Sequence, residues 1–423
     1  MHSVDKGDGY LRILDEIMEI NKNNPQISKD LRFNYIVHDI ETVTKLKRLI
    51  GRINLNLPVL IEGKTGSSKT SMIEYLGYLS NNKVVKINLS ALTDTSDLIG
   101  KFIPNDGFLS KEDLDFDLLN SDKSKEIFKK CEAQNRDLSK HESLIISKQE
   151  NISIPEWKWL HGVIPQAMIN GYWVILDEIN LANPSILERL NSVLELEPSL
   201  RLTEYNNLLI SRYGDINISE NFRIFGTMNP LEYVGRNEFS DAYFDRWQGY
   251  IYFDDVNKKG YYDMLMYLIT GLHPEVYYNN FIYASKTSDN HVFNILSNLT
   301  NIGLFISKLV ELHIDIGIKK DKEHLNYKSR IILTRRTLIS VISFMARKIY
   351  YSPKENSTFN IEKSTSYIIK EALIENYVLK AQDETDKEKI MDTIEMNGIL
   401  GLDIRVDSSS SSASDNKKTL ATL

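Results

Sequence analysis

A glycine- and serine-rich segment separates a short apolar strand from a helical segment that begins at Ser71. Its residues are Gly63-Lys64-Thr65-Gly66-Ser67-Ser68-Lys69-Thr70. In this context backbone N–H groups and the start of a helix converge on an anion, so the segment predicts a phosphate-binding loop. Lys69 would reach the β- and γ-phosphates of a nucleotide, and the Thr70 hydroxyl would be a ligand of Mg²⁺. We expect residues 63–71 to hold the nucleotide.

The loop departs from the usual pattern GxxxxGK[ST] at Ser68, which stands where a glycine normally precedes the lysine. If this position requires a positive φ, a serine there costs on the order of 1–2 kcal/mol. Tight nucleotide binding could tolerate that strain. The alternative is a nucleotide-binding scaffold or switch that hydrolyses little. By itself, the segment also fits an ordinary Ser/Gly-rich turn with an incidental lysine.

Two carboxylates follow a second apolar strand. Tyr172–Leu176 is apolar throughout, and Asp177 and Glu178 come directly after it. A strand buried on both faces delivers such side chains to the C-terminal edge of an open α/β sheet, where ligands bind. Asp177 would then belong to the Mg²⁺ shell, and Glu178 would polarise the attacking water. Alone, the pair also fits an exposed turn, but the phosphate loop upstream favours the catalytic interpretation.

Two more polar side chains could complete such a site. A third strand, Phe222–Gly226, leads to Asn229, which could orient the water between the phosphate and Glu178. Further along, Arg246 could reach the γ-phosphate held by a neighbouring chain. Taken separately, an asparagine before proline is common in turns, and a lone arginine is usually solvated or salt-bridged.

These side chains require a frame in which strand ends meet at one edge. Between residues 33 and 255, strands alternate with helical segments, which predicts βαβ units and a mainly parallel sheet. After residue 256 the strand signals fade, and residues 256–400 have helical periodicity. We therefore predict an α/β domain followed by a helical domain.

Three segments lie outside this outline. In residues 1–32, the amphipathic stretch Tyr10–Ile20 predicts a short helix. Residues 105–154 are rich in lysine and aspartate and predict a surface insertion, with helices near Ser124–Cys131 and Ser139–Ile146. Residues 401–423 are serine-rich, and we expect a disordered tail there.

Composition excludes several classes of protein. The 423 residues fit two or three domains. The net charge of −7 argues against a general binder of nucleic-acid backbones, although it leaves open a motor that contacts nucleic acid in a narrow channel. No window approaches the ~20 apolar residues that cross a bilayer, so we expect no membrane association. A single cysteine permits neither an internal disulfide nor a cysteine metal cage, which favours an intracellular location, cytoplasmic or nuclear.

Together these motifs resemble the AAA+ ATPases, specifically the midasin/dynein-related branch that includes MoxR-type proteins, over about residues 33–400. The resemblance does not rest on the phosphate loop alone. Five further segments resemble motifs of this branch: Thr93–Gly100, Trp157–Ala167, Leu176–Ala182, Thr227–Pro230 and Gly235–Arg246.

The resemblance implies a role for each matching residue. Arg336 becomes the sensor 2 candidate at the start of a lid helix, although Arg335 stands where the branch has a proline. The other roles are Walker A for Lys69 and Thr70, Walker B for Asp177 and Glu178, sensor 1 for Asn229 and the arginine finger for Arg246.

The resemblance also implies a fold and an activity. The fold would be a P-loop NTPase of the AAA+ type, a parallel sheet flanked by helices and followed by an α-helical lid domain. Its cofactors would be ATP and Mg²⁺, and its activity ATP hydrolysis that remodels a protein client. Members assemble into rings with ATP at subunit boundaries, so we expect neighbouring AAA+ subunits as partners, in a homo- or hetero-oligomer.

Overall fold

The computed structural model describes residues 2–24, 27–28, 30–105, 119–133, 138–150, 156–231, 235–288, 292–322, 333–351 and 361–405. These residues form two compact units. Unit 1 consists of those within Met1–Leu89, Ile175–Leu181 and Arg223–Leu423. Unit 2 consists of those within Ser90–Val174 and Ala182–Phe222. The chain therefore leaves unit 1 and returns to it twice.

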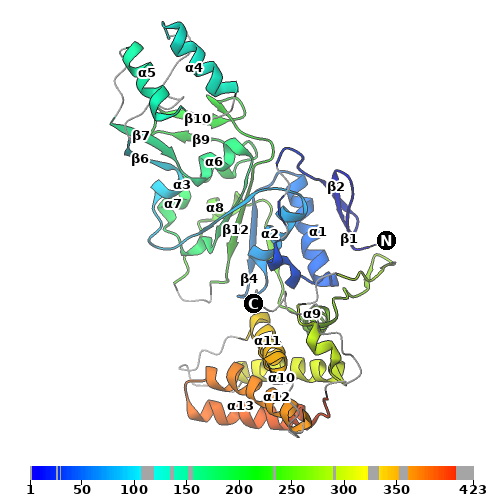
Figure 1. The fold of residues 1–423 in the computed structure, drawn as a ribbon. Coiled ribbons are helices and arrows are strands. Elements are labelled where there is room, and N and C mark those ends of the chain that lie inside the picture. The colour runs from blue at the N-terminus through cyan, green and yellow to red at the C-terminus, as the bar shows by residue number, and fades with distance from the viewer. Residues whose placement is uncertain are drawn as a thin grey trace. The chain divides into compact units, whose positions relative to one another are not determined.

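A five-stranded sheet carries the strand ends that matter for the site (Figure 1). Strand β4 runs parallel to both β12 and β13. In the β12–β4 pair, Phe225 lies opposite Val59. Strand β4 forms from apolar side chains that are fully covered, namely Val59, Leu60 and Ile61. In sheet order the strands are β13 (Ile251–Phe253), β4 (Val59–Gly63), β12 (Arg223–Met228), β8 (Trp173–Asp177) and β5 (Val84–Asn88). The predicted α/β fold with a parallel sheet is confirmed.

Two helices pack against β4. Helix α1 (Ile40–Asn54) begins at Asp39, whose side chain accepts a hydrogen bond from the Thr42 backbone N–H. Its buried face includes Val43 and Leu46, at the three-residue spacing of an amphipathic helix. Helix α2 (Lys69–Leu79) follows the glycine- and serine-rich loop directly.

The later part of unit 1 is helical, as predicted, and has one shared apolar core. A short hairpin of β14 (Val276–Tyr278) and β15 (Phe281–Tyr283) was not predicted. Its turn residues, Asn279 and Asn280, both have positive φ, which asparagine tolerates better than most residues. The sheet and these helices fall in one unit, so the boundary between residues 255 and 256 stays a prediction. The helices are α9 (Lys258–Thr270), α10 (Ile302–Lys322), α11 (Arg335–Tyr351), α12 (Ile361–Asn376) and α13 (Glu384–Asn397).

Unit 2 contains the two helices predicted for the insertion, α4 (Asp122–Ala133) and α5 (Lys140–Glu150). They contact each other around a small core that includes the buried Cys131 and Ile146. Residues 106–118, 134–137 and 151–155 of the insertion lie outside the described residues. The other α-helices and strands of unit 2 are α3 (Thr95–Leu98), β6 (Gly100–Pro104), β7 (Trp157–His161), α6 (Val163–Asn170), α7 (Pro184–Glu188), β9 (Leu200–Leu202), β10 (Leu208–Ser211) and β11 (Ile216–Asn217).

The helix predicted for Tyr10–Ile20 is wrong. That stretch forms two antiparallel strands, which join β1 (Val4–Lys6) in a three-stranded sheet: β2 (Tyr10–Ile13) and β3 (Glu16–Glu19). Within β2, Leu11 and Ile13 are fully buried while Tyr10 and Arg12 are more exposed, which is the period-two pattern of a strand. The chain then turns at Leu14, which has a φ of 55°. Apolar spacing that also fits a helix concealed this alternation.

The predicted boundary of the disordered tail is also wrong for its first residues. Ile404 is buried, and Arg405 exchanges hydrogen bonds with Thr300 through its backbone N–H and C=O. Residues 401–405 therefore pack against the helical part of unit 1, and residues 406–423 lie outside the described residues. Over the described parts of the chain, every helix is too short or too polar to cross a membrane.

Three stacked rings connect the segment before α1 to the helical part of unit 1. The His273 ring is the middle one of the stack. It lies 4.1 Å from the nearly parallel His38 ring and 4.2 Å from the Tyr267 ring. The His38 backbone N–H donates to His273 Nδ1 over 3.0 Å. Burial lowers the pKa of His273 to about 4 and holds the pKa of His38 well below its usual value.

These two imidazoles predict a loss of stability in acid. The unfolded residues take up protons near pH 6.5 and the folded ones only well below it, so the unfolded chain binds more protons between these values. The stabilisation is complete above pH 6.5 and is lost as the pH falls toward about 4. Urea unfolding at several pH values should show this decline. His273→Asn keeps an acceptor near the Nδ1 position but cannot take up the proton. As the pH falls by one unit below 6.5, the unfolding free energy of this variant should therefore decline by about 1 kcal/mol less than that of the unmodified protein. Equal slopes would contradict this account.

Candidate active site

The loop between β4 and α2 is wrapped around the Lys69 ammonium. Lys69 Nζ donates to the carbonyl oxygens of Gly63, at 2.7 Å, and Lys64, at 3.0 Å. A Cβ on Gly63 would lie 2.7 Å from the Phe253 carbonyl oxygen, so this close turn requires glycine. Gly66 has a φ of +86°, which also suits glycine. The loop therefore keeps its shape through two glycines and one buried lysine.

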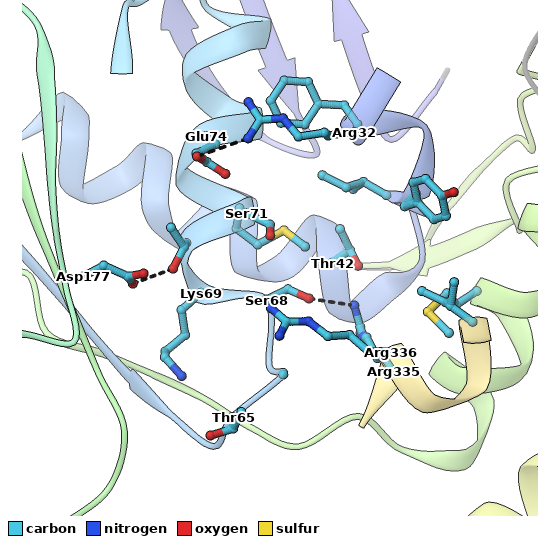
Figure 2. Close-up of a pocket in the computed structure, with 18 of the residues that line it drawn as sticks. Arg32, Thr42, Thr65, Ser68, Lys69, Ser71, Glu74, Asp177, Arg335 and Arg336 are labelled. Atoms are coloured by element: carbon cyan, nitrogen blue, oxygen red, sulfur yellow. Dashed lines mark hydrogen bonds and ion pairs between the residues drawn. The ribbon is translucent and has the colours of Figure 1, made fainter. Parts of the chain in front are cut away.

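Ser68 adopts the left-handed conformation that we considered for this position, with φ 66° and ψ 26°. It precedes the first residue of α2, but its side chain makes no capping hydrogen bond to the helix. Its hydroxyl instead accepts a long hydrogen bond of 3.4 Å from Arg335 Nη1 (Figure 2). The strain expected for a serine in this conformation therefore applies.

The Asp177 carboxylate is surrounded by three donors. Thr70 Oγ1 donates to Asp177 Oδ1 over 2.7 Å (Figure 2), and Thr227 Oγ1 donates to the same oxygen. Lys86 Nζ lies 2.9 Å from Asp177 Oδ2. Burial alone would raise the pKa of Asp177, but these donors outweigh it and hold that pKa below its usual value. Asp177 is therefore held as a carboxylate beside the Thr70 hydroxyl, and such oxygens suit Mg²⁺.

A chain of hydrogen bonds joins the loop lysine to the second acidic residue. Lys69 Nζ donates to Asn229 Oδ1 over 2.9 Å, and Asn229 Nδ2 donates to Glu178 Oε1 over 2.7 Å. Arg236 Nη1 lies 2.9 Å from the other oxygen, Glu178 Oε2. Burial lowers the pKa of Lys69 to about 8, although the charges of Glu178 and Asp177 oppose this shift. A phosphate arriving at the loop would therefore meet a lysine that has few water contacts and is positioned by its neighbours.

A cavity of about 480 Å³ lies over the loop and reaches the helical part of unit 1. Its lining includes residues of the loop and both acidic residues. Arg335 and Arg336, at the start of α11, also line it (Figure 2). Its lining also includes the apolar side chains of Ile36, Val37, Met72, Met264 and Ile339. The volume and the mixture of polar and apolar lining residues suit a nucleotide.

Ten of the fourteen predicted site residues line one cavity, three complete the loop, and one lies elsewhere. Thr65, Gly66, Ser68, Lys69, Thr70, Ser71, Asp177, Glu178, Asn229 and Arg336 line it. Gly63, Lys64 and Ser67 form the rest of the loop without lining the cavity. Arg246 ends α8 (Asp241–Asp245), and its Nη1 donates to the Ala242 carbonyl oxygen. It is not part of the cavity wall.

Lys86, Arg236 and Arg335 were missed as site residues. Lys86 is the one charged residue within the strand sequence VVKIN, and a charge inside an otherwise apolar strand pattern is a usable signal. Arg236 lies within the motif Gly235–Arg246, but nothing in the sequence pairs it with Glu178. Arg335 and its neighbour Arg336 could not be ranked from the sequence, and the structure brings both to the cavity.

Comparison with known proteins places these residues in a family context. Residues 145–247 match the AAA domain of the dynein-related subfamily. Midasin from Dictyostelium discoideum is 26% identical over 236 residues, which cover 56% of this chain and 3% of that protein. Gas vesicle ATPase GvpN1 from Halobacterium salinarum is 27% identical over 217 residues, which cover 51% of this chain and 52% of that protein. The resemblance to the midasin/dynein-related AAA+ proteins, and the AAA+ fold, are confirmed.

The matches have limited extent. The chain spans 3% and 4% of two midasins and about half of the gas vesicle ATPases. The AAA domain match contains Asp177, Glu178, Asn229 and Arg246, but it begins after the phosphate loop. The assignment of that loop therefore depends on its own geometry.

The strain at Ser68 predicts a stabilising substitution. Ser68→Gly removes the left-handed penalty of on the order of 1–2 kcal/mol but adds freedom to the unfolded chain, so we expect a net gain of up to about 1 kcal/mol. Urea denaturation measures this gain. Ser68→Ala is the matched control, because it also removes the hydroxyl contact to Arg335 but keeps the Cβ. If both variants change the unfolding free energy equally, the strain is not the cause.

Proposed function

We propose that this AAA+ chain is a Mg²⁺-dependent ATPase. The observation that carries the proposal is the continuous contact from Lys69 through Asn229 to Glu178, beside the Thr70–Asp177 pair in one cavity. Phosphoryl transfer to water needs positioned charge and a positioned water, and no covalent nucleophile. These five side chains supply both requirements.

Each residue has a distinct part in this proposal. Lys69 exchanges Asn229 Oδ1 and its loop carbonyls for the β- and γ-phosphate oxygens, while Asn229 turns toward the γ-phosphate and the water. Glu178 accepts a hydrogen bond from that water and aligns it for attack. Thr70 and Asp177 would hold Mg²⁺, which neutralises charge on the phosphates when it is bound.

We also propose that hydrolysis requires a neighbouring subunit. Arg246 lies outside the cavity wall of its own chain, so as a finger it would act on the nucleotide of the next subunit. A ring of such subunits provides that geometry, and closure of the helical part over the cavity could convert the phosphate state into movement. The substrate of that movement would be a protein client rather than nucleic acid, inside the cell, in cytoplasm or nucleus.

The first prediction concerns Lys69 and Glu178. Glu178→Gln should keep nucleotide binding within a few-fold and lower turnover at least about 100-fold, because the amide cannot act as the base. Lys69→Ala should lower turnover as strongly and also weaken binding, because the loop loses its charge. Mg-ATP turnover per subunit and nucleotide binding by calorimetry measure these effects.

Glu188→Gln, an exposed substitution at the end of α7, is the matched control and should retain full turnover. Full turnover in Lys69→Ala would refute the ATPase proposal. Nucleotide binding without turnover in the unmodified protein would instead favour a nucleotide-dependent switch.

The second prediction concerns Arg246. Arg246→Ala should bind ATP normally but lose at least about 100-fold in turnover, because the transition-state charge is no longer neutralised. Mixing it with Lys69→Ala should restore part of the turnover, since one variant keeps the phosphate loop and the other keeps the finger. Arg405→Ala, which removes an exposed arginine beside Asp403, is the control. No restoration in the mixture would argue against action between subunits.

A further inference from the structure

Both oxygens of the Glu178 carboxylate have a protein partner, one through a hydrogen bond and the other through an ion pair. Asn229 Nδ2 donates to Oε1 over 2.7 Å, and Arg236 Nη1 lies 2.9 Å from Oε2. The Arg236 side chain is 11% exposed and that of Glu178 33%, so this ion pair is largely shielded from water. A carboxylate activates water only when one of its oxygens faces that water. In this arrangement each carboxylate oxygen already has a protein partner.

The backbone supports the position of Glu178. Glu178 has a φ of 57°, which is uncommon for a residue with a long side chain. Its N–H donates to Thr227 Oγ1 over 3.3 Å, next to the contact that Thr227 makes with Asp177. The Glu178 side chain is therefore directed by a strained backbone as well as by its two partners.

Arg236 belongs to the segment that leads from β12 to α8. The Asn237 N–H donates to the Asn180 carbonyl oxygen over 2.8 Å, and Asn180 Nδ2 donates to the Asn229 carbonyl oxygen over 2.8 Å. The residues beside Arg236 are thus attached to the residues that follow Glu178. The same segment continues into α8 and ends at Arg246.

We propose that Arg236 is a positioning residue that holds Glu178 in a resting orientation, and that its release is a condition for hydrolysis. This inference rests on the proposed function. Once a γ-phosphate engages Lys69 and Asn229, Arg236 is the remaining partner of Glu178 among the contacts described here. Movement of the segment that carries Arg236 and Arg246 then frees the carboxylate. Because both arginines lie on one segment, contact with a neighbouring subunit would be linked to release of the base.

Turnover of Arg236 variants tests this role in the full chain. Arg236→Met removes the charge and keeps most of the apolar stem, so kcat for Mg-ATP should rise about three- to tenfold, with KM changed less than about twofold. Arg236→Lys keeps a cation and should stay within about twofold of the unmodified protein. Arg236→Gln provides a second neutral variant if the methionine variant does not fold. A kcat equal to or below that of the unmodified protein in the neutral variants would overturn the proposal.

A second measurement does not depend on turnover. Thermal unfolding without nucleotide is compared for the unmodified protein, Arg236→Met, Glu178→Gln and the double variant. Arg236→Met should lower the midpoint of the unmodified protein and lower that of the Glu178→Gln variant clearly less, because the ion pair is already lost there. Equal shifts in both backgrounds would overturn the pairing. If no protein in the set hydrolyses ATP, the proposed function fails while this cycle still decides the pairing.

Discussion

The Lys69 ammonium organises the candidate site. It is taken out of water and compensated by two backbone carbonyls of its own loop and by the side chain of Asn229, which follows β12 far away in the sequence. Burying a charged group is costly unless its hydrogen bonds are replaced, so each of these acceptors is needed. Three features bring these acceptors to the ammonium: the close turn at Gly63, the pairing of β4 with β12, and the direction of the Asn229 side chain.

The two acidic residues present the complementary problem. Asp177 and Glu178 lie side by side at the end of β8, and each has its own cation, Lys86 and Arg236 respectively. Both carboxylates at this strand end are therefore paired before any ligand arrives. A nucleotide with its metal brings both signs of charge, so binding exchanges internal pairs for external ones and does not simply fill an empty hole.

The sequence predicted the elements that local patterns determine. The apolar runs of β4 and β8, the loop between β4 and α2 and the helices of the later chain are all visible in short windows. The same windows failed at residues 10–20, where the spacing of the apolar residues fits both a helix and a strand. They also failed at Arg236, whose partner Glu178 is far away in the sequence. Pairings between distant segments depend on topology, and a single sequence does not encode them in any short window. The positive φ at Ser68 was foreseeable because the loop pattern reserves that position for glycine.

The residues that line the cavity are as far apart in the sequence as Ile36 and Ile339. Between them the chain also builds unit 2, which is interposed twice before unit 1 is complete. Contacts of such large sequence separation form slowly, because the ends of long loops must meet before any of the contacts stabilises the others. During synthesis the phosphate loop emerges early, whereas α11 emerges some 270 residues later, from Arg335 onward. A growing chain therefore cannot complete this cavity until α11 is available, which makes nucleotide capture a late event in the maturation of the protein.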